Sequence, residues 1–279
     1  MKRGRTLAEI VTVVVAAVVA FPLFWMVLTA VKPPDEVVST TPRPWTLHPS
    51  LGSFTRALTV ADFGRYFVNS VVVAIAVVVL SVGIAFLAAA ALTRFRFRGR
   101  TVLLVMLLVV QMVPVEALTV PLFFLMRELG RTAPALGLNH LGSLVLVHLA
   151  FSLPFAIWLL RGFTRAVPVE LEEAATLDGA SRFTFLRRVL FPLVAPGLVA
   201  TSVLSFTHAW NDFLFAKTFI ISDARNQTLP LALQVFVRPD DPDWGAVMAG
   251  STLMTIPVLI FFVLAQRRLV GGLAGAVKG

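Results

Sequence analysis

The chain has 279 residues, of which 58% are hydrophobic and only 14% charged, and its mean hydropathy is +0.87. Because a soluble domain has about a quarter of its residues charged, this composition excludes an ordinary soluble protein and favours one that crosses a membrane several times. Cysteine is absent, which excludes a disulfide framework and a thiolate metal site. The net charge of +9 by itself would suit nucleic-acid binding, but the positions of the charges along the chain argue against it.

Six apolar runs are each long enough to cross a bilayer, which takes about 20 helical residues for about 30 Å of hydrocarbon. The runs are Ile10–Val31, Tyr66–Leu92, Thr101–Met126, Leu136–Leu160, Val189–His208 and Val247–Leu264. They are too long for transmembrane strands and do not alternate between apolar and polar residues. We therefore predict an all-α, polytopic membrane protein with six transmembrane helices. Internal prolines such as Pro114 and Pro154 are tolerated where neighbouring helices satisfy the freed carbonyls.

The first run, Ile10–Val31, could instead be a cleaved signal peptide. It is longer than the apolar region of most signal peptides, and no A-x-A-like site followed by a polar segment comes after it. We therefore expect a retained membrane helix.

The basic residues are distributed unevenly between the two sides that six spans create. With the N-terminus inside, the inner segments hold 15 of the 24 Lys and Arg residues and 5 of the 15 acidic residues, a net charge of +10. The remaining 9 basic and 10 acidic residues give −1 for the rest. Because short inner loops are enriched in Lys and Arg, we predict that both termini lie in the cytoplasm. The basic balance then reflects orientation, and nucleic acid is not an expected partner.

The spans divide the chain into three expected parts. Residues 1–65 form a first helix and an outer loop, residues 66–268 a core of five helices, and residues 269–279 a cytoplasmic tail. The outer loop Lys32–Arg65 contains five prolines, which predict an ordered, non-helical cap. A second long outer loop covers Asn211–Gly245.

The inner loop at residues 168–192 has the pattern of two short helices joined at Gly179. Pro168 precedes the first helix, whose early turns carry three glutamates where the helix dipole favours anions. Gly179 can adopt the positive φ at which a helix stops. Either Asp178 or Ser181 could then cap the second helix.

Small and apolar residues form a stripe on the first of these helices, namely Leu171, Ala174, Ala175 and Leu177. Small side chains permit close approach, so the stripe suits a helix that lies in a groove of another protein. An amphipathic helix on the inner leaflet of the membrane is the alternative, and the composition does not exclude it.

The same loop carries a spaced motif: Glu173-Ala-Ala, three residues, Gly179, nine residues, then Val189-Leu-Phe-Pro192. It resembles the EAA signature of ABC importer permeases, with Val189 in place of Ile and Phe191 in place of Leu. The resemblance implies a coupling helix that docks in a cleft of a separate ATPase subunit. The residues to which it assigns this coupling are Glu173, Ala174, Ala175, Asp178 and Gly179.

Further segments along nearly the whole chain are similar to the maltose-type sugar permeases. They are Lys32, Phe67-Val-Asn-Ser70, Ala91–Arg100, Val113-Pro114, Pro121-Leu-Phe, Pro154–Arg161, Ala209–Phe213, Asp243-Trp-Gly245 and Ala274–Gly279. The resemblance implies a type I ABC importer permease bundle in the bacterial inner membrane, and the shorter of the two permeases in such an importer.

The partners that this resemblance implies are an ATP-binding subunit dimer, a second permease, a periplasmic or lipid-anchored solute-binding protein and membrane lipid. ATP and Mg would be handled by the ATPase subunits, because no G-x-x-x-x-G-K-[ST] motif occurs here and this chain is expected to bind no cofactor. The implied cargo is a mono- or oligosaccharide. A polyol or a glycerol-phosphate-like solute is the alternative.

Polar residues inside apolar runs are candidates for a solute path, because unpaired polar groups are costly in a bilayer. Gln111 and Glu116 flank Pro114 in the third run, and Trp210, Asn211 and Asp212 follow the fifth. Interhelical hydrogen bonding and interfacial Trp anchoring are the plainer alternatives. His148 and His208 are more typical of satisfied bundle residues than of ligands, and no metal site is expected.

Two other classes of protein fit the sequence less well. An enzyme is disfavoured because there is no H-E-x-x-H, no G-x-S-x-G and no cysteine. A self-contained carrier or channel would not need the glycine-hinged inner loop, whose evident use is to bind a soluble partner.

Overall fold

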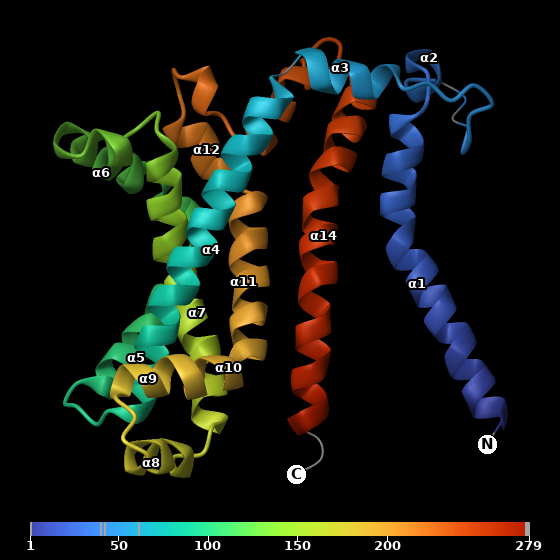
Figure 1. The fold of residues 1–279 in the computed structure, drawn as a ribbon. Helices are drawn as coiled ribbons and strands as arrows, with labels where there is room; N and C mark the ends of the chain where they lie inside the picture. Colours follow the sequence, from blue (N-terminus) through green and yellow to red (C-terminus); the bar gives the residue numbers. More distant parts are fainter. Residues whose placement is uncertain (1, 40, 42, 61, 277–279) are drawn as a thin grey trace. The chain divides into compact units, whose positions relative to one another are not determined.

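The structure, a computed structural model, describes residues 2–39, 41, 43–60 and 62–276, with side chains described from residue 9 to residue 266 (Figure 1). Pro42 of the outer loop and Lys278 of the tail lie outside the described residues, as do the side chains of Lys2, Arg3, Arg5, Arg267 and Arg268. Every regular element in the described part of the chain is helical. The all-α prediction is confirmed.

In the described part of the chain, four helices are long and apolar enough to cross a membrane by themselves. They are α1 (Lys2–Ala30), α4 (Phe63–Arg94), α7 (Leu141–Ala166) and α14 (Trp244–Ala276). Their apolar parts cover 22, 32, 26 and 23 residues, each at least about 30 Å at the rise of an α-helix. Four of the six predicted spans are therefore single helices, and α1, α7 and α14 contain Pro22, Pro154 and Pro257 without a break.

The third predicted span is not one helix. Helix α5 (Arg100–Val110) stops before Pro114, and α6 (Thr119–Thr132) resumes after a 3₁₀ turn at Val115–Leu118, bent by 92°. Proline has no N–H to donate and disfavours helical backbone in the residue before it. The prediction of an uninterrupted helix over Thr101–Met126 was therefore wrong.

The fifth predicted span is broken in the same way. Helix α9 (Arg182–Phe185) continues through a π-helical turn into α10 (Phe191–Leu193), and the chain bends by 75° at Val194 before α11 (Ala195–Trp210). Pro196 lies in the first turn of α11, where a missing N–H costs least. The continuous helix predicted over residues 189–208 was wrong. With each bent pair counted as one span, the number of candidate spans is six.

The outer loop after α1 is partly helical, which corrects the prediction of a non-helical cap. It holds α2 (Pro34–Val37) and α3 (Gly52–Val60). Proline fits the first position of α2, and the proline cluster ends at Pro49, so nothing prevents a helix from Gly52 onward.

The chain folds into two compact units, and each is described here by itself. The first comprises residues 1–65 and 229–258. It contains α1 to α3, α13 (Leu229–Ala232) and the first part of α14. Its small core joins Ala30, Ala57 and Ala249, which are fully buried. Alanine at these positions lets α1, α3 and α14 approach closely.

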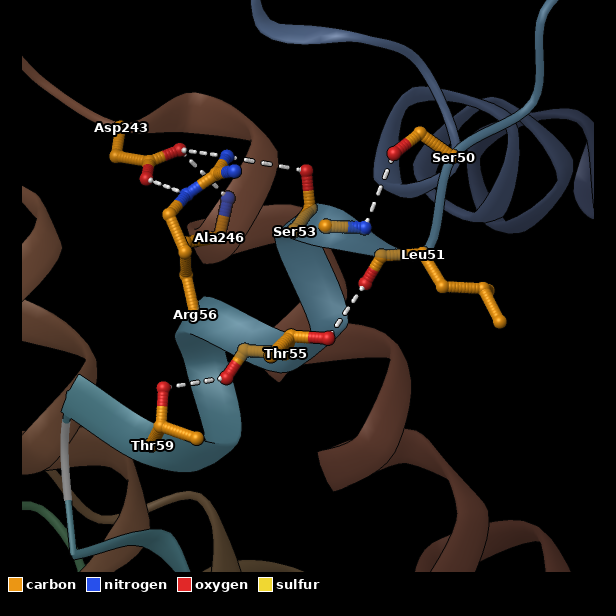
Figure 2. Close-up of polar contacts among 9 residues, drawn as sticks. Ser50, Leu51, Ser53, Thr55, Arg56, Thr59, Asp243 and Ala246 are labelled. Carbon is orange, nitrogen blue, oxygen red and sulfur yellow. Dashed lines mark hydrogen bonds and ion pairs between the residues drawn. The ribbon is translucent and has the colours of Figure 1, made fainter.

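An ion pair fastens α3 to the start of α14 in this unit. Arg56 donates from Nε to Asp243 Oδ2 at 2.6 Å and from Nη2 to Oδ1 at 3.1 Å (Figure 2). Asp243 Oδ1 also accepts from the backbone N–H of Ala246 at 2.9 Å, as a helix cap does (Figure 2). The hydrogen bond from Arg56 above all, and also that from Ala246, lowers the pKa of Asp243, and the bond with Asp243 raises the pKa of Arg56. Both side chains line a hollow of about 650 Å³ and remain about a third exposed, so solvent screens the pair.

The lowered pKa of Asp243 predicts that α3 loosens in acid. A carboxylate whose pKa is lower in the folded state stabilises that state above its unfolded pKa, about 3.9, and this contribution is lost as the pH falls through the folded value. We expect amide protection of residues 52–60 to fall below about pH 4, by at most about 1 kcal/mol because the pair is partly exposed. Hydrogen exchange between pH 5 and pH 3, corrected for intrinsic rates, measures it. Asp243→Asn should remove this pH dependence, and an unchanged profile in that variant would contradict the assignment.

The second unit comprises residues 66–228 and 259–279. Its core is formed by α4, α7, the segment from α9 to α10, and α11, with Ala89, Leu160 and Leu190 fully buried. Gly197 of α11 lies against the ring of Phe163 in α7, where a Cβ would come within 2.5 Å of ring carbons. Helices α5, α8 (Glu170–Leu177) and α9 lie at one end of this unit, and α6 and α12 (Leu214–Phe219) at the other (Figure 1).

Candidate functional site: residues 168–192

Helix α8 ends in a glycine-dependent cap. Gly179 has φ +77°, in the left-handed region. The N–H of Gly179 donates to the carbonyl of Thr176 at 3.0 Å, and that of Ala180 donates to the carbonyl of Ala175 at 2.9 Å. This is the Schellman pattern, which satisfies the last carbonyls of a helix. The predicted stop at Gly179 is confirmed.

Helix α9 then begins with a side-chain cap. Ser181 Oγ accepts from the backbone N–H of Thr184 at 3.2 Å. Of the two residues that the sequence left open for this role, the cap is Ser181, whereas Asp178 is the C-cap residue that follows α8. The loop is therefore two short helices joined at Gly179, as predicted.

The two faces of α8 have different surroundings. Glu172 and Ala175 are partly buried, and Ala175 packs against the core of the unit. At 3.6 residues per turn, Glu173, Ala174 and Leu177 lie on the opposite face and are exposed, with Leu177 89% exposed. The Ala-Ala pair is thus divided, because Ala174 faces outward and Ala175 faces the bundle. We call Glu170, Glu173, Ala174 and Leu177 the outward face.

Arg94, the last residue of α4, contacts both α7 and α8. Its Nη2 donates to the carbonyl of Val167 at 2.9 Å and to that of Thr164 at 3.4 Å, and its Nε lies 3.5 Å from Glu172 Oε2. By sequence, Arg94 is one of four arginines in a predicted inner segment, residues 94–100. Nothing in the sequence distinguishes it from the neighbouring arginines, because its partners come from distant segments.

The candidate path residues fall into two groups. Gln111 ends α5 and Glu116 lies in the 3₁₀ turn after it, and both are exposed at this break. Trp210, Asn211 and Asp212 lie at the end of α11, where Asn211 is exposed. A role of either group in solute passage stays a prediction.

Trp210 and Asp212 each have a structural role. Trp210 is 1% exposed and stacks on Phe206, with ring centroids 5.4 Å apart. Asp212 accepts hydrogen bonds from the N–H groups of Phe215 and Ala216 at 3.2 and 3.0 Å, which caps α12. Its Oδ2 lies 3.3 Å from Nε2 of His148, which is buried.

His148 and His208 lie close together, with ring centroids 6.3 Å apart. Among the residues that the structure describes, no three His, Cys, Asp or Glu side chains form a group that could hold a metal ion. The described side chains at this position therefore form a packed aromatic and polar cluster.

The chain is similar in sequence to known transport proteins along nearly its whole length. The family model described as "Binding-protein-dependent transport system inner membrane component" matches residues 81–274. The chain is 40% identical over 283 residues to the diacetylchitobiose uptake system permease protein DasC of Streptomyces coelicolor, with 100% of each chain covered. It is 34% identical to the trehalose/maltose transport system permease protein MalG of Thermococcus litoralis, over 99% of this chain and 97% of that protein.

A crystal structure of a bacterial ABC transporter involved in the import of alginate has the same fold. The TM-score is 0.79 at 19% sequence identity, over 95% of this chain and 96% of that chain. The predicted importer-permease bundle is confirmed. The matched family consists of transport components and not of enzymes, and the several apolar helices accord with a multi-pass inner membrane protein. The chain belongs to the family of binding-protein-dependent transport system inner membrane components.

Proposed function

We propose that this chain is a permease subunit of an ATP-driven importer whose cargo is a small carbohydrate. The proposal is supported by relatives of nearly full length that are named for diacetylchitobiose, for trehalose and maltose, and for trehalose. A glycerol-containing solute is the second candidate. It is favoured by a relative from Agrobacterium fabrum, 33% identical over 93% of this chain, that is named a sulfoquinovosyl glycerol permease.

The outward face of α8 is the observation that carries the proposed coupling to ATPase subunits. Leu177 is almost fully exposed and lies beside Glu173 and Glu170, on a helix whose other face is held by the bundle. Helices that lie on a membrane surface are rich in Lys and Arg, and the inner leaflet is negatively charged. An acidic face with one exposed leucine therefore favours a protein groove over lipid.

The proposed assembly has four kinds of partner. An ATPase dimer receives α8 and handles ATP and Mg, a second permease completes the pathway, a solute-binding protein delivers the cargo, and lipid surrounds the spans. We infer that the end of the second unit that bears α8 is cytoplasmic. Support comes from three arginines at that end: Arg94 is the last residue of α4, Arg100 the first of α5, and Arg165 lies in the last turn of α7.

The mechanism that this arrangement supports is alternating access. ATP-driven closure of the ATPase subunits displaces α8, and the spans packed against it follow. A bundle with two packed arrangements then exchanges an outward opening for an inward one.

Two substitutions on the outward face should weaken ATPase binding. Burying a leucine stabilises a complex by about 1.5–3 kcal/mol, so Leu177→Ala should lower the affinity for the ATPase about tenfold. Glu173→Lys reverses a charge in the same contact and should cost about 30-fold or more. Co-purification of the ATPase with the permease from membranes, titrated with added ATPase, measures both.

Leu58→Ala is the matched control, because Leu58 is an exposed leucine of α3 in the other unit. It should leave ATPase binding unchanged. If Leu177→Ala and Glu173→Lys both bind the ATPase normally, the coupling proposal is contradicted. Uptake of maltose, trehalose, diacetylchitobiose and glycerol glycosides by the complete importer then decides between the two classes of cargo.

A further inference from the structure

Arg94 is a charged residue enclosed by three helices. Only 6% of its side chain is exposed, whereas Arg96 and Arg98 in the following loop are exposed. A buried guanidinium is costly unless its donors find partners. An exposed arginine would orient the chain in the membrane equally well. The burial of Arg94 therefore indicates a further role.

The partners of Arg94 are two carbonyls at the C-terminal end of α7 and one carboxylate of α8. Thr164 lies in the last turn of α7 and Val167 directly after it, at the helix end that carries partial negative charge, and the Thr164 carbonyl also accepts from the N–H of Val167 at 3.4 Å. Nη2 donates to both carbonyls, and Nε forms an ion pair with the Glu172 carboxylate on the inner face of α8 at 3.5 Å, without a hydrogen bond. One planar side chain thus joins the ends of α4 and α7 to the first turn of α8.

The next residue extends this connection to α9. The guanidinium of Arg182, the first residue of α9, lies 5.2 Å from the ring centre of Phe95, within cation–π distance. The end of α4 therefore contacts both short helices of the loop. The apolar contact of Ala175 with the core is non-directional and would let α8 slide, whereas the fork of an arginine fixes direction.

We propose that Arg94 is a positioning residue that makes α8 move as one body with the ends of α4 and α7. This inference rests on the proposed function, because α8 transmits motion to the spans only if the ATPase subunits displace it. The contacts of Arg94 are with the end of α7 and the inner face of α8, and not with the outward face. Its loss should therefore impair transmission and leave ATPase binding intact.

Arg94→Gln and Glu172→Gln test the proposal in the complete importer, reconstituted with its ATPase and solute-binding protein. We expect ATP hydrolysis stimulated by the best-transported sugar of the panel above to fall about tenfold in Arg94→Gln and about threefold in Glu172→Gln. The double variant should be no worse than Arg94→Gln, since the two residues share one contact. Affinity for the ATPase should stay unchanged in each.

A spin-label distance provides a readout that needs no solute. The chain has no cysteine, so Thr176→Cys in α8 and Ala166→Cys at the end of α7, both at exposed positions, can be labelled without other changes to it. In the otherwise unchanged chain, the distance between these labels should be the same with ATP and without nucleotide. In Arg94→Gln, ATP should shift and broaden it.

Arg98→Gln removes the same charge from an exposed neighbour and should behave as the unaltered protein. If Arg94→Gln fails to assemble, Glu172→Gln carries the test, because Glu172 is a third exposed and its loss leaves the carbonyl contacts of Arg94 in place. Full stimulation together with a nucleotide-independent label distance in the assembled variants would overturn the inference. If Glu173→Lys still binds the ATPase normally, the proposed function itself fails. If Glu173→Lys loses binding but the Arg94 variants keep full stimulation and an unchanged label distance, the inference alone fails.

Discussion

Gly179→Pro should abolish coupled transport while the protein still inserts in the membrane. Proline requires φ near −65°, whereas residue 179 has φ +77° and donates its N–H to Thr176. The variant therefore loses the cap of α8 and the turn into α9. In vesicles reconstituted with the complete importer, stimulation of ATP hydrolysis by solute should fall by a factor on the order of 100.

Two alanine variants calibrate this result. At both Gly179 and Gly162, a Cβ would meet nothing within 4 Å, but only Gly179 has positive φ. Gly179→Ala should thus lose about 1–2 kcal/mol from backbone strain alone and couple partially, and Gly162→Ala should couple normally. Unchanged stimulation in Gly179→Pro would show that α8 is not the coupling element.

Gly142→Ala should destabilise the end of the second unit that lies opposite α8. The added Cβ would overlap the carbonyl oxygen of Ala135 and lie 3.1 Å from its carbon. Ala135 belongs to a short 3₁₀ turn, Pro134–Leu136, that packs between α6 and the first turn of α7. Because the obstacle is backbone, rotating a side chain cannot relieve the overlap. We expect a loss of about 3 kcal/mol.

Thermal unfolding of the purified protein in detergent measures this loss, which should appear as a Tm about 10 °C lower. Gly162→Ala in the same helix is the matched control and should change Tm little, because its Cβ site is open. Equal Tm values for the two variants would mean that the close approach of Gly142 to Ala135 does not contribute to stability.

Several features could be predicted from the sequence because they depend on local chemistry. Runs of about 20 apolar residues must be helical in a bilayer, where each backbone group needs a partner within its own segment. The break at Gly179 follows from the positive φ of a helix stop, and the Ser181 cap from a hydroxyl at the start of the next helix. The sequence did not show which prolines end a helix, since Pro154 and Pro257 lie inside helices whereas Pro114 follows a break.

The amino-acid sequence by itself determined the helical class and the position of the hinged loop, because length, hydropathy and backbone preference act within a few residues. Only the tertiary structure decided that Arg94 meets Glu172, that Arg56 meets Asp243, and that α8 turns Ala175 inward and Leu177 outward. These contacts join residues far apart in the chain. They depend on how whole helices pack, which the spacing of residues along one helix does not specify.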